Sequence, residues 1–390
     1  MMNGRTPDVK ALGVVLLLLT MLGVSMAGYS APGVPASDSE VLARVGVGGA
    51  TTPRLAAARQ RLAADPDNVA AGVEIARIYL EMGRTEGDPR FISYAQAALT
   101  PWLSRPNTPQ SVLVLAAVAE QNLHRFDEAL AMLDRALALS PSDGQAWLVK
   151  ASLLQTRGDF SSARRACSQL IQTAGQLVAV TCLASANGMT GRLAPSYASL
   201  QSIFRDDARL DSGLRGWVYG ELADMAQRAG NSRAAENHFR AAMSAAPDDS
   251  YHKGAYADFL LLSQRPREVI ALLNRHVDQD ALLLRLAIAA ERAGDARAAR
   301  WSSMYEARLE AARARGDKTH DREHARFLLD VRNDSQQALQ LAQRNWQVQR
   351  EPEDIRLYVR AALAARNEAA QKAVQRWISE HRYEDHTLSP

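Results

Sequence analysis

The chain has 390 residues, of which 47% are hydrophobic and only 6% are aromatic. Alanine and leucine therefore supply most of the apolar side chains, a composition that favours packed helices over β-sheet. The 46 basic and 43 acidic residues give a formal net charge of +3 and form no long run of one sign. Such a sequence lacks the concentrated positive field of a nucleic-acid-binding surface, so nucleic acid is not expected as a partner.

The first 27 residues have the organisation of a secretory signal peptide. Arg5 and Lys10 precede an apolar run over residues 11–24, and small residues follow at 25–28. The run is about 14 residues long, shorter than the roughly 20 that a membrane-spanning helix needs. We expect cleavage after Ala27 and a location that is periplasmic or otherwise extracytoplasmic. The alternatives are an uncleaved segment that anchors the chain to the inner membrane, and an uncleaved segment on a cytoplasmic protein.

Residues 28–53 lack helical periodicity and are rich in Gly, Pro and Ser, which predicts a flexible linker. From residue 54 to residue 380, amphipathic stretches follow one another in pairs, and residues 381–390 form a C-terminal tail. The expected organisation is a signal peptide, a linker and one helical region.

The pairs recur about every 34 residues. In the clearest copy, Ala129 and Leu133 share a helix face, Pro141 follows the helix, and the next pair turns at residues 158–160 with the sequence Gly-Asp-Phe. Because several offsets agree together, the pattern resembles the tetratricopeptide repeat. The resemblance implies an all-α fold, an α-solenoid that forms a right-handed superhelix of about nine helical hairpins.

Small residues mark the positions where neighbouring helices are expected to approach closely. In the first helices of the pairs these residues are Ala117, Ala151, Ala184, Ala223, Ala257 and Ala287. In the second helices they are Ala129, Ala163, Ser196, Ala235 and Ala299, with Leu133, Leu200, Phe239 and Leu273 filling the space between hairpins. Turns are predicted at Gly158, Gly191, Gly230 and Gly294, because glycine tolerates the positive φ that ends a helix.

The resemblance implies that the first helices line a concave face, which binds a peptide or a helix of another protein. Amide side chains both donate and accept hydrogen bonds and a Trp offers a flat anchor, so exposed residues of these types are the candidate contacts. The candidate protein-binding residues are Gln121, Asn122, Gln145, Ser152, Gln155, Trp217, Asp224, Gln227, Arg228, Tyr251, Asp258, Glu291 and Arg292. The alternative for each is an ordinary solvated helix face or, for Trp217, packing against the preceding loop.

Cys167 and Cys182 are the only cysteines. They are expected on adjacent antiparallel helices, where an oxidising compartment would allow a disulfide that stabilises the fold by roughly 3 kcal/mol. The alternative is a pair of buried thiols that pack as small hydrophobic side chains.

Residues 320–324 have the sequence H-D-R-E-H and fit the H-x-x-E-H pattern of a group of zinc peptidases. On a helix, His320 and His324 would share a face as metal ligands, with Glu323 as the base. A helix start explains the same residues, with Thr319 as the cap and acidic side chains in the first turn. We favour the helix start, so no metal is expected.

No phosphate-binding glycine loop, nucleophile motif or haem-attachment motif occurs in the sequence, so neither catalysis nor a cofactor is expected. The sequence predicts a non-catalytic extracytoplasmic scaffold that binds a segment of another exported or membrane protein. One alternative is an accessory subunit for the assembly of a periplasmic enzyme or cofactor. Another is a zinc metallopeptidase built on residues 320–324.

Overall fold

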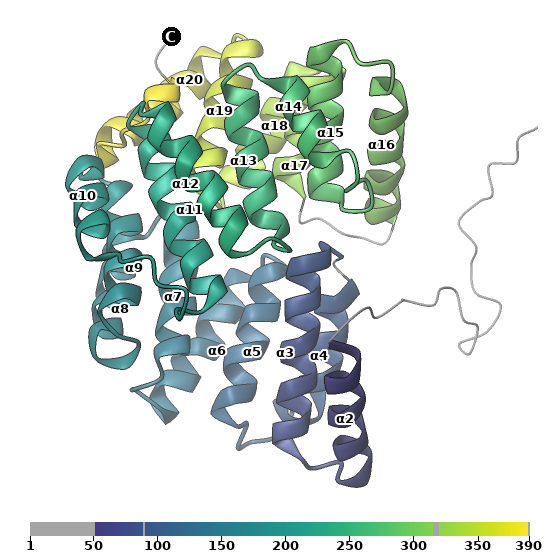
Figure 1. Ribbon diagram of the computed structural model, residues 1–390, viewed down its shortest axis with the longest axis vertical. Coiled ribbons are helices and arrows are strands. Elements are labelled where there is room, and N and C mark those ends of the chain that lie inside the picture. The colour runs from purple at the N-terminus through teal and green to yellow at the C-terminus, as the bar shows by residue number, and fades with distance from the viewer. Residues whose placement is uncertain (1–50, 89, 315–319, 389–390) are drawn as a thin grey trace, which may run out of the picture. The chain divides into compact units, whose positions relative to one another are not determined.

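The computed structural model describes residues 51–88, 90–314 and 320–388 (Figure 1). These residues form 19 α-helices and no β-strand. The predicted signal peptide and almost all of the predicted linker lie outside the described residues. Helix α2 (Thr51–Ala64) begins before the predicted linker end at residue 53.

After α2, the helices alternate between the first and the second helix of nine hairpins. The first helices are α3 (Val69–Glu86), α5 (Gln110–Asn122), α7 (Gly144–Thr156), α9 (Gln176–Gly188), α11 (Ser212–Arg228), α13 (Ser250–Leu262), α15 (Asp280–Ala293), α17 (Asp321–Phe327) and α19 (Pro352–Ala364). The second helices are α4 (Arg90–Leu103), α6 (Phe126–Leu139), α8 (Phe160–Thr173), α10 (Leu193–Ile203), α12 (Ser232–Ala245), α14 (Pro266–Leu273), α16 (Ala298–Ala314), α18 (Ser335–Trp346) and α20 (Glu368–His381). The prediction of an all-α solenoid of about nine hairpins is confirmed.

The predicted close contacts between first helices are also confirmed. All six alanines of the first helices are at most 3% exposed, and Leu133, Leu200, Phe239 and Leu273 are buried in the second helices. Some helix starts are fixed by side-chain caps, as where Asp143 accepts a hydrogen bond from the backbone N–H of Ala146 (2.9 Å). Small residues and capped starts together let successive hairpins stack at short range.

Every hairpin turn contains one residue with positive φ. Five of these residues are glycines, namely Gly87, Gly158, Gly191, Gly230 and Gly294. The other four are His124, Gln264, Asn333 and Arg366, which were not predicted because the turns were predicted from glycines. The turn geometry is therefore constant along the array although its sequence is not.

One predicted contact is wrong. Ala299 is exposed, whereas Trp301 and Ser302 are buried on the same helix. The reason is the turn before α16, which runs from Gly294 to residue 297 and is longer than the turn before α8, where the helix starts two residues after the glycine. Because the turn is longer, the buried positions of α16 fall at higher residue numbers than the repeat pattern predicts.

The array of hairpins turns back on itself, and one closing contact joins the end of α3 to the starts of α13 and α15. Arg84 forms an ion pair with Asp249, and the Ser250 hydroxyl donates to the carbonyl of Arg84 (2.9 Å). The Gln279 amide donates to the carbonyl of Thr85 (3.4 Å). Accordingly, α3 to α6 lie below α13 to α20 in Figure 1.

A second closing contact joins the C-terminal hairpin to earlier turns. The backbone N–H of Arg350 donates to the carbonyl of Thr156 (2.7 Å). The rings of Phe160 and Trp377 meet edge to face, with their centroids 6.4 Å apart. Hairpins that are distant in sequence therefore pack directly on one another.

The residues after α20 extend this second contact. Tyr383 and the Asp385 side chain are buried, and the chain ends in the 3-10 helix η2 (His386–Leu388), which packs on α11 and α19. The Glu384 carboxylate accepts a hydrogen bond from the backbone N–H of Leu193 (3.0 Å). Within the described ranges, no helix combines the length and the apolar character that crossing a membrane requires.

Candidate functional site

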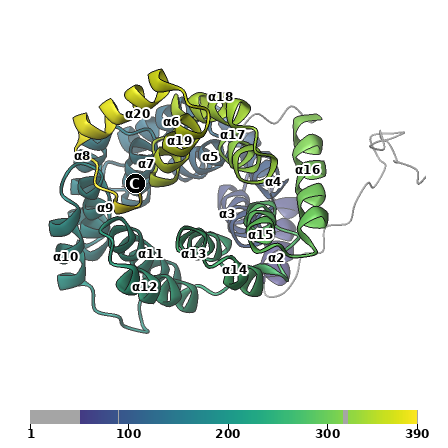
Figure 2. The same ribbon diagram turned by 90° about the horizontal axis from the view of Figure 1, so that it is seen from above.

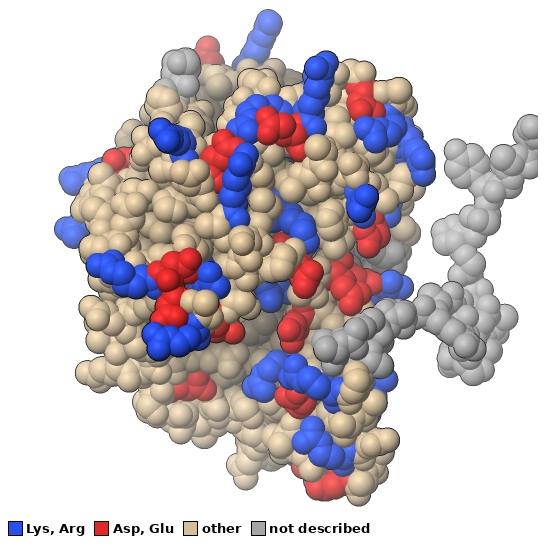
Figure 3. Space-filling view, viewed as in Figure 1, with Lys and Arg blue, Asp and Glu red and all other residues tan. Residues whose placement is uncertain are grey.

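The first helices lie on the inside of the array and the second helices on the outside (Figure 2). We call the surface that α11, α13, α15, α17 and α19 present toward one another the inner face. On the outer view in Figure 3, basic and acidic side chains are interspersed and no broad region carries a single sign. The inner face is where opposite walls of the array bring charged and aromatic groups together.

Tyr251, at the start of α13, is the most accessible large side chain of the inner face, with 71% of its surface exposed. Burial by the surrounding protein nevertheless raises its pKa well above the ordinary value, and nearby carboxylates raise it further. These carboxylates belong to Glu353, Glu351, Glu221 and Asp224. The ring therefore contacts solvent inside the array, with protein and carboxylate groups around it.

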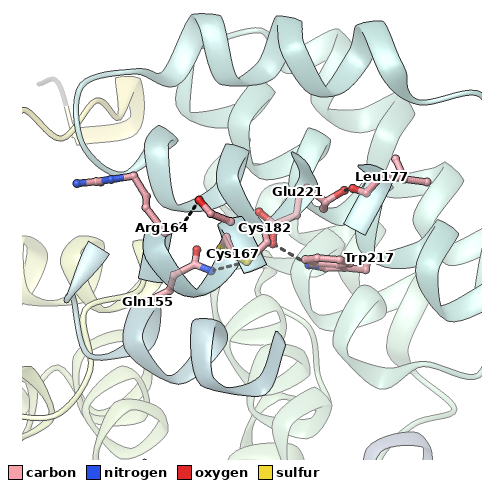
Figure 4. The surroundings of a disulfide bond; sticks show 9 residues. Gln155, Arg164, Cys167, Leu177, Cys182, Trp217 and Glu221 are labelled. Atoms are coloured by element: carbon pink, nitrogen blue, oxygen red, sulfur yellow. Dashed lines mark hydrogen bonds between the residues drawn. A yellow bond between two sulfur atoms is a disulfide. The ribbon is translucent and has the colours of Figure 1, made fainter. Parts of the chain in front are cut away.

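Glu221, on α11, is one of these carboxylates. Burial, followed by the charge of Asp224, raises its pKa to about 7. Its carboxylate accepts a hydrogen bond from the indole N–H of Trp217 (3.1 Å), which fixes the orientation of both side chains (Figure 4). At neutral pH this carboxyl group can therefore hold or release a proton.

Asp258, on α13, is shared by two arginines of the following first helices. Arg285 of α15 donates from Nε (3.0 Å), and Arg326 of α17 binds in a bidentate manner at 2.7 and 3.2 Å. Burial alone would raise the pKa of Asp258, but the two guanidinium groups lower it to about 2. The carboxylate stays ionised at physiological pH and joins three helices.

Asp330 forms a second shared site one hairpin further on. It lies in the π-helical segment η1 (Leu328–Arg332), which continues α17. Arg292 of α15 donates to it at 2.8 Å, and Arg360 of α19 forms an ion pair with the same carboxylate. Two aspartates thus each hold two arginines along the inner face.

Four residues of these pairs occupy one position of the repeat, namely Asp258, Arg292, Arg326 and Arg360, whereas Arg285 and Asp330 lie at other positions. Residues 224, 258, 292, 326 and 360 succeed one another at an interval of about 34, the period of the hairpins. The same interval links residues 217, 251 and 285, and twice this interval separates residue 285 from residue 353. Five residues of these two rows were predicted from the sequence, namely Trp217, Asp224, Tyr251, Asp258 and Arg292. Four were missed, namely Arg285, Arg326, Glu353 and Arg360, which are found by counting forward in steps of one period.

Two predicted binding residues are buried inside the array. Gln227 is 8% exposed and Arg228 is 2% exposed. Arg228 donates to the carbonyl of Gly188 (2.8 Å) and to Asp224 (2.7 Å), and it lies over the ring of Tyr383. These contacts hold α9, α11 and the C-terminal segment together, so no partner reaches Arg228 in this structure.

The remaining predicted residues lie on several first helices, and their contacts are with the array itself. Asn122 is exposed, and its amide donates to the carbonyl of Val118 on its own helix (2.8 Å). Glu291 is exposed and accepts a hydrogen bond from Ser302 of α16 (3.3 Å). The other three, Gln121, Gln145 and Ser152, lie on α5 and α7 and range from partly buried to exposed.

Cys167 of α8 and Cys182 of α9 form a disulfide, with Cα atoms 5.5 Å apart (Figure 4). The Gln155 amide lies 3.9 Å from the sulfur of Cys182, and Trp217 packs on the same cluster of buried residues. The disulfide therefore supports the wall of the array that carries Trp217 and Glu221.

A helix starts at residues 320–324, with Asp321 and Glu323 in its first turn, as predicted. The predicted cap is wrong, because the N-cap of α17 is His320, whose side chain forms no cap hydrogen bond, and not Thr319, which lies outside the described residues. His324 is buried, and Arg313 is hydrogen bonded to its ring (2.8 Å). Burial and this guanidinium lower the pKa of His324 to about 4. Among the residues that the structure describes, no three His, Cys, Asp or Glu side chains are grouped so that they could hold a metal ion.

Comparison with known families shows that residues 123–179 match the tetratricopeptide repeat. The comparison with curated proteins gives no match. Three solved structures of similar fold share 11 to 14% sequence identity with the chain.

The first of these structures is the APC/C hetero-tetramer Cut9–Hcn1, at 14% identity and a TM-score of 0.42, covering 84% of this chain and 52% of that chain. This chain therefore spans about half the length of that relative. A tetratricopeptide repeat protein from Parabacteroides merdae has 12% identity and a TM-score of 0.30, covering 84% of this chain and 100% of that one. Human IFIT1, in a dimer with PPP-AAAA, has 11% identity and a TM-score of 0.41, covering 85% and 94%.

Proposed function

We propose that the chain is a non-catalytic scaffold outside the cytoplasm that binds a segment of another exported or membrane protein on its inner face, because residues 123–179 match the tetratricopeptide repeat and the described helices form nine stacked hairpins. Repeats of this kind serve protein–protein interaction.

The observation that carries the proposal is Tyr251. A large aromatic side chain that is 71% exposed, and is surrounded by the walls of the same array, is a ready anchor for a partner segment. The carboxylates around it, and the ion pairs of Asp258 and Asp330 on the same face of the array, offer polar contacts to the same segment. Such a surface favours recognition of a chain segment over binding of a flat protein face.

Export is supported by two features of the chain. Residues 1–27 have the organisation of a signal peptide, and the disulfide between Cys167 and Cys182 is of a kind that persists in oxidising compartments. Both features favour a role outside the cytoplasm.

The surface can be tested by site-specific photo-cross-linking in the native cells. We expect a chain that carries p-benzoylphenylalanine in place of Tyr251 to form one dominant protein adduct, identified by mass spectrometry. The matched control places the same group at Tyr94, which is 40% exposed on α4 of the outer side. Adducts that form at Tyr94 with equal yield, or at Tyr94 alone, would reject the inner face as the binding surface.

A further inference from the structure

The two closing contacts of the array differ in what holds them together. The first, between the end of α3 and the starts of α13 and α15, is built from polar groups. Arg84 pairs with Asp249, and its carbonyl accepts a hydrogen bond from the Ser250 hydroxyl (2.9 Å). The Gln279 amide donates to the carbonyl of Thr85 (3.4 Å). Each of these groups can exchange its partner for water, so little hydrogen bonding is lost when the contact opens.

The ion pair adds little to the strength of the first contact. The Arg84 side chain is 51% exposed, and an ion pair open to water is screened by solvent and salt. The Gln279 side chain is buried, and its amide oxygen has no hydrogen-bond partner among the described residues. Burying this oxygen without a partner costs free energy, which opening of the contact would recover.

Carboxylates oppose one another across the same contact. Glu86, at the end of α3, interacts with the carboxylates of Asp88 and of Asp278, which precedes α15. Partial burial, and then these two carboxylates, raise the pKa of Glu86 above its ordinary value. The rise means that the three groups repel one another when all are ionised. This repulsion acts against the attraction that the ion pair of Arg84 provides.

The second closing contact is apolar and well buried. Phe160, Met189, Ile355 and Tyr383 form one cluster that joins α8, the end of α9 and α19 to the C-terminal segment. None of the four is more than 6% exposed. Burying an apolar side chain of this size stabilises a contact more than an exposed ion pair does. We therefore expect the array to open at the first contact and to stay closed at the second.

The part that moves on opening is the N-terminal arm, by which we mean α2 to α6. The second contact holds α8, α9 and α19 together, so the hinge lies between the arm and α7. Each hairpin of a solenoid contacts mainly its neighbours, and a small rotation there separates α3 from α13. The turn of the arm at His124 lies near the start of α17, where the groups that act on its ring include Glu323 and Arg322. Charged groups, which water can solvate, thus face the arm here as well.

Tyr251 lies directly at the first contact. It follows Asp249 and Ser250 in the sequence, and its ring is 71% exposed. On the front of the molecule, where α3 lies below α13, charged side chains of both signs gather (Figure 3). Separation of the two helices would bring the tyrosine ring to an opening at the side of the array. The middle of a longer chain can reach the ring from the side, whereas only a free chain end is easily threaded along the axis of the closed array.

We propose that the N-terminal arm is movable, that it opens at the first closing contact, and that it closes over an internal segment of the partner beside Tyr251. This inference deepens the proposed function and rests on it for the nature of the occupant, a segment of another protein chain. The polar contact makes opening inexpensive in free energy, and the tyrosine ring supplies the anchor.

The test measures access to residue 251 in the purified full chain. p-Azidophenylalanine replaces Tyr251, and two probes carry a cyclooctyne on a flexible glycine–serine linker of about 40 residues. In the internal probe the cyclooctyne lies at the middle of a linker between two small folded proteins. In the end probe it lies at the free end of the same linker on one such protein. Because the coupling is slower than the movement of the arm, the coupling rate of the internal probe should follow the open fraction.

A disulfide can lock the first contact. A Cβ placed on Gly87 would lie 3.5 Å from the Cβ of Gln279, a separation that a disulfide spans. We expect the oxidised pair Gly87→Cys and Gln279→Cys to slow coupling of the internal probe about tenfold or more, and to leave coupling of the end probe unchanged. The reference is the pair Gly87→Cys and Gln279→Ser, which changes the same turn and forms no bridge.

A matched lock belongs to the second contact. A Cβ placed on Gly230 would lie 3.4 Å from the Cβ of His386, and both Gly87 and Gly230 have positive φ, so the two locks change similar turns. The oxidised pair Gly230→Cys and His386→Cys should leave the coupling rates of both probes unchanged. Mass spectrometry verifies that each bridge has formed.

Two charge variants should shift the opening in opposite directions. Arg84→Gln removes the ion pair and should raise the coupling rate of the internal probe about two- to fivefold. Asp278→Asn removes a carboxylate that repels Glu86 and should lower the rate by a similar factor. The matched control is Arg105→Gln, because the Arg105 side chain is 45% exposed and pairs with Asp67 (2.6 Å) outside the contact. It should leave the rate unchanged.

Three results would overturn the movable arm: equal coupling of the internal probe to the locked and unbridged chains, no coupling of this probe to the unbridged chain, or the same direction of change in both charge variants. The probes require no natural partner, so these results are separate from the cross-linking in cells. An adduct at Tyr251 without an effect of the lock would leave the proposed function standing and reject the arm. An effect of the lock without an adduct would keep the arm and reject the inner face as the partner's surface.

Discussion

Glu221 is the carboxyl group of the inner face whose protonation changes near neutral pH. Burial and the neighbouring Asp224 raise its pKa from 4.5 to about 7. A folded-state pKa above the unfolded value means that the folded protein binds the proton more tightly. The contribution of this group to stability is therefore present below pH 4.5 and is lost as the pH rises to 7 and above.

Replacing this carboxyl group by a neutral isostere should remove the free-energy cost of burying its charged form. We expect Glu221→Gln to raise the free energy of unfolding at pH 8 by about 1 to 2 kcal/mol, a range reduced for solvent screening because the side chain is partly accessible. The gain should shrink as the pH falls toward 5, since the wild-type carboxyl group is then protonated in the folded state. Urea unfolding at a series of pH values measures it, with Glu310→Gln on the exposed side of α16 as the control. A gain that does not depend on pH would contradict the assignment.

A glycine in the turn did not decide which inner-face residues the sequence revealed. Asp258 was named although its turn, at Gln264, lacks glycine, whereas Arg285 was missed although its turn, at Gly294, has one. The missed residues lie at the repeat positions of the named ones and are found by counting in steps of 34 residues. The shared ion pairs could not be predicted either, because Asp258 and Arg326 meet only after two hairpins have stacked.

At the scale of single elements, the turn between the two helices of a hairpin is the most constant feature. It contains a residue with positive φ in all nine hairpins that the structure describes, whether or not that residue is glycine. A residue with a side chain costs roughly 1 to 2 kcal/mol in this conformation. The packing of the two helices therefore imposes the turn, and His124, Gln264, Asn333 and Arg366 adopt it under strain.

Relieving this strain at an exposed turn should stabilise the protein. We expect Arg366→Gly to raise the free energy of unfolding by about 1 kcal/mol, measured by urea or thermal unfolding. The reciprocal change, Gly294→Ala, should lower it by about the same amount, because a Cβ at residue 294 meets no atom within 4 Å and only the backbone conformation is penalised. Destabilisation by Arg366→Gly would show that its side chain, and not the turn, sets the energy.

At the scale of the whole array, the contacts between neighbouring hairpins could be predicted from the sequence, whereas the two closing contacts could not. Alanines at a regular interval predict which hairpins stack, since each hairpin of a solenoid contacts mainly its neighbours. The pairing of Arg84 with Asp249, and of Phe160 with Trp377, depends on the small rotation accumulated over several hairpins. No local sequence pattern reveals this accumulated rotation. The enclosure of Tyr251 is a consequence of it and was likewise not predictable.

The disulfide links the stability of the array to the compartment in which it folds. It joins α8 to α9, residues 15 apart in sequence, and should contribute about 3 kcal/mol in the chain-entropy description. In a reducing cytoplasm this contribution is absent. A chain retained in the cytoplasm should therefore contain two free thiols and unfold at a lower urea concentration.

Export itself can be measured with a reporter. We expect a phosphatase that is active only in the periplasm to be active when fused after Gln60, because residues 1–27 have the organisation of a signal peptide. Deleting residues 11–24 should abolish the activity, since the apolar run is what the export machinery recognises. Thiol titration of the denatured full-length chain should give no free thiol with the intact signal and two after the deletion. An inactive fusion that is made in normal amounts would place the array in the cytoplasm, and the partner would then be sought there.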